Sequence, residues 1–66
     1  MKLTRMQTAV LSLYARGLDH EQIAKRMERS PSAIYAHTKA VRDAWRLETY
    51  EQLRDRARDL GLDRLS

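Results

Sequence analysis

The stretch LDHEQIAKRMERSPSAIYAH, residues 18–37, contains two helix starts about three helical turns apart. Asp19 precedes Gln22 by three residues, which is the spacing of a capping box, where the two side chains satisfy backbone N–H groups that the helix leaves free. Ser30 followed by Pro31 is a second start, because serine is a favoured N-cap and proline in the first helical position loses no hydrogen bond. The stretch therefore predicts two separately capped helices.

The residues between the two starts predict a short amphipathic helix. Ile23, Ala24 and Met27 fall on one face at helical spacing. A short helix, a tight turn and a longer helix form the layout of a helix-turn-helix, whose second helix can enter the major groove of DNA. This stretch indicates a function more strongly than any other part of the chain.

Similar signals predict a helix on each side of this pair. Residues 4–7 and 49–52 both have threonine followed three positions later by glutamine, the capping-box spacing, and Gly17 and Gly61 stand where helices end. No segment has the alternation of a strand, and there is no repeat or linker. We therefore expect one all-α domain over residues 1–66, a compact bundle of four helices at about 5–16, 20–28, 31–46 and 50–60.

The composition limits the possible functions. The chain has 66 residues, a net charge of +4 and no cysteine, so it has room for one small core. Its two histidines, His20 and His37, have no cysteine partner, so we expect no metal site. We also expect no cofactor, and no catalytic constellation that would make the chain an enzyme. No apolar run is long enough to span a membrane and no signal-peptide pattern is present, which favours a soluble, cytoplasmic protein without a membrane partner.

The basic side chains are concentrated in two segments. Residues 1–16 carry three basic and no acidic side chains, and residues 29–46 carry four basic side chains and one acidic. A polyanion would meet these two surfaces. The charge alone also fits ordinary solvated helix faces, so this alternative stays open.

The predicted helix at residues 31–46 separates by face. Ile34, His37, Val41 and Trp45 are expected to point inward, with His37 as a packed structural histidine. The opposite, mostly basic stripe is expected to contain Tyr35, Thr38, Lys39, Arg42 and Arg46. Such a stripe offers donors for base edges and phosphates.

Taken together, these residues resemble a known family. The positions that carry the resemblance are Leu3-Thr4, Val10-Leu11, Gly17, Ile23-Ala24, Met27, Ser30, Ala33-Ile34, His37, Val41, Trp45-Arg46-Leu47 and Gly61-Leu62. They are similar to the LuxR-type (GerE-like) DNA-binding domain over nearly the whole chain. The most specific part is Ser30-x-x-Ala33-Ile34-x-x-His37, where the family usually has Ser-x-x-Thr-Val-x-x-His. A sigma-factor region-four domain resembles the same stretch more loosely.

The resemblance implies which residues would contact DNA. The third helix would read the major groove through Tyr35, Ala36 and Lys39. The resemblance implies phosphate contacts near His20, Ser32 and Arg42, and we also expect phosphate contacts from Ser30, Thr38 and Arg46. The chain departs from the family at Ala33, where the usual threonine hydroxyl is absent, and at Ala44 and Tyr50, where basic residues are usual. The preferred DNA site cannot therefore be carried over from the family.

The last helix has two interpretations. Its inner stripe is expected to be Tyr50, Leu53, Ala57 and Leu60, which leaves Arg54, Asp55, Arg58 and Asp59 as an outer face of alternating charge. Such a pattern is usually a solvated face with salt bridges. It could also pair two copies as a weak homodimer, because a two-fold interface must be self-complementary.

The leading hypothesis from the sequence is a small, stand-alone transcriptional regulator that binds double-stranded DNA through its third helix. The alternative is a protein-binding module that modulates another transcription regulator, such as a larger LuxR-type protein, or RNA polymerase. Mutations on the last helix, rather than the third, would disrupt the function of such a module.

Overall fold

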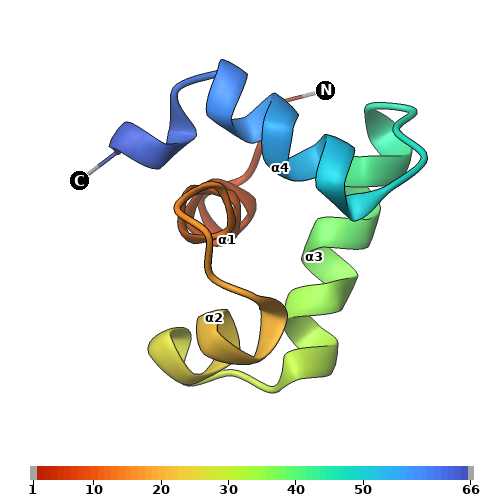
Figure 1. Ribbon diagram of the computed structural model, residues 1–66. Coiled ribbons are helices and arrows are strands. Elements are labelled where there is room, and N and C mark those ends of the chain that lie inside the picture. The colour runs from red at the N-terminus through yellow and green to blue at the C-terminus, as the bar shows by residue number, and fades with distance from the viewer. Residues whose placement is uncertain (1, 66) are drawn as a thin grey trace.

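The computed structural model describes residues 2–65 and contains four α-helices followed by a short 3-10 turn (Figure 1). The described residues contain no strand, which confirms the all-α prediction. The helices are α1 (Arg5–Ala15), α2 (His20–Met27), α3 (Pro31–Ala44) and α4 (Tyr50–Asp59), and the turn is η1 (Leu62–Arg64).

All four helices begin at the predicted caps. Thr4, Asp19 and Thr49 each form a complete capping box, and the Ser30 hydroxyl accepts from the Ala33 N–H at 3.2 Å. The ends come one or two residues earlier than the predicted bounds 5–16, 20–28, 31–46 and 50–60. The largest difference is in α3, which stops two residues short because Arg46 has the left-handed backbone conformation (φ 58°), which an α-helix cannot continue through.

Helix α1 is the centre of the fold. It is seen end-on in Figure 1, with α2 and α4 on opposite sides of it and α3 alongside, and it contacts every other element. Its fully buried residues Val10 and Leu11 pack with Ile23 of α2, Ile34 of α3 and Leu53 of α4. Val10 and Leu11 of α1 therefore both belong to the core.

The buried faces of α3 and α4 differ from the predicted ones at several positions. Thr38, expected in the outer basic stripe, is completely buried, whereas His37 and Trp45 are only partly buried. The buried stripe of α3 is Ile34, Thr38 and Val41, which has regular i, i+4, i+7 spacing. In α4, Leu60 is 56% exposed because it follows the last helical residue.

The charged face of α4 is also different from the predicted salt-bridged surface. Both ion pairs found among residues 2–65 involve Asp43 of α3, not α4. Arg54 instead donates from Nη2 to the Leu18 carbonyl at 3.0 Å, and Arg58 donates from Nε to the Ala15 carbonyl at 2.8 Å. These hydrogen bonds link α4 to the end of α1 and to the connection that leads into α2.

Within residues 2–65, no helix is both long enough and apolar enough to cross a bilayer.

Candidate nucleic-acid interface

Helices α2 and α3 form a helix-turn-helix arrangement. The chain leaves α2 at Glu28, which has a left-handed conformation (φ 56°), and the Arg29 N–H then bonds to the Ala24 carbonyl at 2.9 Å. This Schellman-like end turns the chain sharply. Ser30 and Pro31 start α3 immediately afterwards, so α2 and the first half of α3 pack against each other (Figure 1).

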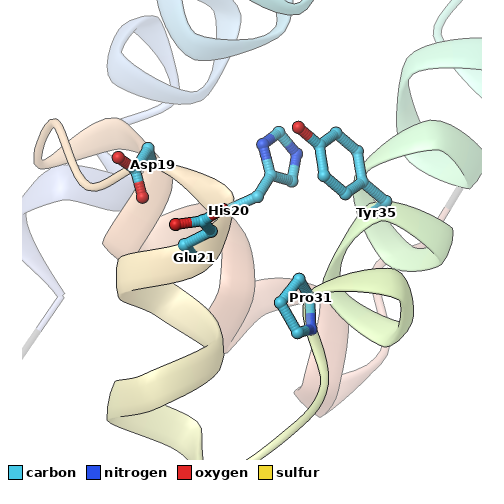
Figure 2. A pocket seen from close by; sticks show the side chains of 5 residues that line it. All are labelled: Asp19, His20, Glu21, Pro31 and Tyr35. Atoms are coloured by element: carbon cyan, nitrogen blue, oxygen red, sulfur yellow. The ribbon is translucent and has the colours of Figure 1, made fainter.

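The start of α2 and the middle of α3 are joined by a pair of stacked rings. The imidazole of His20 and the phenol of Tyr35 lie parallel, with centroids 3.7 Å apart and an angle of 3° between the ring planes. Figure 2 shows Tyr35 extending from α3 toward His20. The His20 Nε2 is 2.8 Å from the hydroxyl of the buried Thr38. The ring is therefore held both by stacking and by a hydrogen bond.

Two further tyrosines complete what we call the aromatic cluster, namely Tyr14, His20, Tyr35 and Tyr50, one from each helix. Tyr14 and Tyr50 each lie with their ring centroid 5.2 Å from that of His20, at tilted and edge-on angles. The edge-on arrangement is favoured by the ring quadrupoles. The cluster thereby links the helix-turn-helix to α1 and α4.

The environment of His20 keeps its imidazole neutral. Burial is the largest cause that lowers the pKa of His20, and the positive charge of Arg54 lowers it further, against a weaker opposing effect of Asp19. Burial likewise raises the pKa of Tyr14, despite the Arg54 guanidinium 4.2 Å from its ring centroid. Both groups are therefore favoured in their uncharged forms.

The phosphate contact expected from His20 would have to be made from a nearly buried position. Only 7% of the residue is exposed, and its Nε2 is already engaged by Thr38. A hollow of about 330 Å³ lies beside it, and two of the residues that line this hollow are Asp19 and Glu21 (Figure 2). Two carboxylates among the lining residues repel an anion.

The other residues expected to contact DNA fall into three groups. Tyr35, Ala36 and Lys39 are exposed on α3, as are Ser30 and Ser32 at its start and Arg46 beyond its end. Arg42 is only partly exposed. Thr38 is buried and donates to the backbone carbonyls of its own helix, so its placement on the outer face is wrong.

Asp43 neutralises part of the basic stripe. Its carboxylate lies 3.4 Å from Lys39 Nζ and 3.3 Å from Arg42 Nη2, and the Arg42 guanidinium also packs 4.7 Å from the Tyr50 ring centroid. Desolvation opposes ionisation of Asp43, but the hydrogen bonds and charges of Lys39 and Arg42 together hold its pKa below its usual value. The i, i+4 spacing of Lys39 and Asp43 could have revealed this pair in the sequence, whereas nothing in the sequence pairs His20 with Tyr35.

The chain matches none of the protein families, curated proteins or solved structures with which it was compared.

Proposed function

We propose that this chain is a LuxR-type (GerE-like) helix-turn-helix domain that binds double-stranded DNA and regulates transcription, with α3 in the major groove. One observation carries the proposal: α2 and α3 pack as a helix-turn-helix while Tyr35, Ala36 and Lys39 remain exposed together on α3. Exposed side chains on the second helix of such a motif are those that reach base edges.

The charges support the same proposal. The chain carries a net charge of +4, and Lys39, Arg42 and Arg46 line α3 and its end. Arginine and lysine at such positions contact phosphates, which fix the position of the protein on the duplex. DNA would compete with Asp43 for both cations, through base edges at Lys39 and through the phosphates that flank the groove at Arg42, so the ion pairs of Asp43 weaken DNA binding.

Fluorescence anisotropy with labelled duplexes tests the proposal. We expect binding that weakens linearly on a logarithmic scale as salt rises, because phosphate contacts release counterions. Arg46→Ala should weaken binding to every duplex about equally and reduce the salt slope by about one. Asp43→Asn should strengthen binding to all duplexes, because it frees the two cations.

The matched control is Arg56→Ala, which removes the same charge from an exposed position on α4. It should change affinity much less than Arg46→Ala. Absence of binding at low salt, or equal effects of the two arginine variants, contradicts the proposal. If only α4 variants lose function, the chain acts instead as a module that binds another regulator.

A further inference from the structure

The exposed face of α3 has few groups that can form hydrogen bonds to bases. From Pro31 to Ala40 it exposes Pro31, Ser32, Tyr35, Ala36, Lys39 and Ala40. Pro31, Ala36 and Ala40 have no polar side-chain atom, and the Ser32 hydroxyl lies at the helix start, 3.3 Å from the Ser30 hydroxyl. Thr38, whose hydroxyl was expected on this face, is buried. Lys39 is the single cation in this part of the helix. The centre of the candidate reading surface is therefore apolar.

Tyr35 is the largest group on this surface, and it is 47% exposed. One face of its ring is covered by His20, and Tyr50 lies edge-on with its centroid 6.0 Å away. An exposed tyrosine normally has free rotamers that binding must order, at a cost in entropy. Here the cluster fixes the ring in advance, so an apolar contact made by Tyr35 retains more of its favourable free energy.

The major groove offers one apolar feature to such a surface. Each base pair presents donors and acceptors there, but thymine alone adds a methyl group, at C5. Alanine methyls and aromatic rings are the side chains that contact it. A donor-poor surface with a fixed ring thus fits thymine better than guanine, which requires a bidentate donor.

We propose that Tyr35, held by the His20 ring and flanked by Ala36, recognises thymine methyl groups in the major groove and makes this chain selective for thymine-containing sites. The inference rests on the proposed DNA-binding function and deepens it. Tyr35 and Ala36 contact the methyl group. His20 is a positioning residue, which acts by stacking on Tyr35.

Replacing thymine by uracil tests the inference, because it removes the methyl group and keeps the pairing. The preferred duplex is first selected from a random library, and each thymine is then replaced in turn. We expect about a four-fold loss of affinity for each methyl group that is read, as estimated from the transfer of one buried methyl-sized group. Replacement of thymines outside the selected site is the control and should have no effect.

Protein variants separate the roles of the side chains. Tyr35→Phe should keep the thymine-to-uracil ratio, because the hydroxyl is not needed, whereas Tyr35→Ala should bring the ratio close to one. Lys39→Ala should reduce affinity and leave the ratio unchanged. His20→Phe should preserve the ratio by stacking, and His20→Ala should reduce it, with circular dichroism verifying that each variant folds.

The possible outcomes distinguish the two proposals. Salt-dependent duplex binding with equal affinity for thymine and uracil overturns the inference and leaves the proposed function standing. Absence of duplex binding overturns both. If His20→Ala folds and keeps the full ratio, the positioning role of His20 is wrong, and NMR of the Tyr35 ring protons in the free variant then shows whether the ring is still fixed.

Discussion

Thr38 and His20 form a buried polar pair whose hydrogen bonds can be fully assigned. The Thr38 hydroxyl has a single proton to donate. Its oxygen lies 3.3 Å from the carbonyl oxygen of Ile34 and 3.2 Å from that of Tyr35. Since the hydroxyl donates to its own helix, it accepts from His20, and we infer that neutral His20 carries its proton on Nε2. The threonine thus fixes both the orientation and the tautomer of the ring.

Thr38→Val tests this assignment, because valine has nearly the same shape without the hydroxyl. It leaves the His20 Nε2–H without a partner, which costs about 1–3 kcal/mol of folding free energy for a buried polar group. Urea unfolding measures the loss. Thr38→Ser, which keeps the hydroxyl, should lose clearly less, and equal losses for valine and serine would show that packing of the methyl group matters and the hydrogen bond does not.

At this scale helical spacing predicted the exposure of most residues of α3, but not of all of them. Helical spacing correctly placed Tyr35 and Lys39 outside and Ile34 and Val41 inside. The prediction misplaced Thr38, which was assigned to the polar stripe, although its i, i+4 and i, i+3 spacing from Ile34 and Val41 places it on the buried face. The contacts of His20 with Thr38 and Tyr35 were not predicted, for a different reason. These partners come from another helix, and no local pattern encodes a contact between helices.

The helix starts were predictable because each is encoded locally, in four consecutive residues that form a cap. The ends of α2 and α3 were predicted too late, because Glu28 and Arg46 have left-handed conformations. Glycine or asparagine usually signals this conformation, and neither residue stands there. The turn of the helix-turn-helix is therefore made against the intrinsic preference of its sequence.

Glu28→Gly should relieve that strain. The left-handed conformation destabilises a residue with a Cβ atom by about 1–2 kcal/mol, and glycine avoids this cost. Glycine also makes the unfolded chain more flexible, which offsets part of the gain. We expect a net stabilisation of about 0.5–1 kcal/mol in urea unfolding. The matched control is Glu21→Gly, the same substitution at an exposed position in the first turn of α2, where the backbone is not left-handed and glycine should destabilise the helix. Destabilisation by both variants contradicts the strain argument.

At the scale of the whole molecule, contacts between distant segments determine how the other three helices are arranged around α1. Arg54 and Arg58 donate hydrogen bonds to backbone carbonyls 36 and 43 residues away in the sequence. The aromatic cluster contains one ring from each helix. The sequence predicted the number and order of helices, since these depend on local signals. It could not predict these tertiary contacts, because an arginine that binds a carbonyl has the same sequence pattern as a solvated one.

The aromatic cluster should make the stability of the molecule depend on pH. His20 has a lowered pKa in the folded state, so between that value and its ordinary pKa of 6.5 the unfolded chain binds more protons than the folded one. The free energy of unfolding must then rise with pH through this window and fall as the solution is acidified below about pH 6.5. The carboxyl of Asp43 also has a lowered pKa, so it changes stability in the same direction, but in a separate window below its usual pKa of 3.8.

Urea unfolding at intervals from pH 5 to pH 8 measures this dependence. We expect the wild type to lose stability toward pH 5, with a slope that for one group cannot exceed about 1.4 kcal/mol per pH unit. His20→Phe keeps an aromatic ring but cannot be protonated, so its curve should be much flatter over the same range.

Because protonation adds a charge beside Arg54 within the cluster that holds Tyr35, acidification should also reduce the thymine-to-uracil ratio in the wild type and leave it unchanged in His20→Phe. A wild-type curve as flat as that of the variant would mean that the buried imidazole accepts a proton without cost, and the cluster would then be too loose to fix Tyr35.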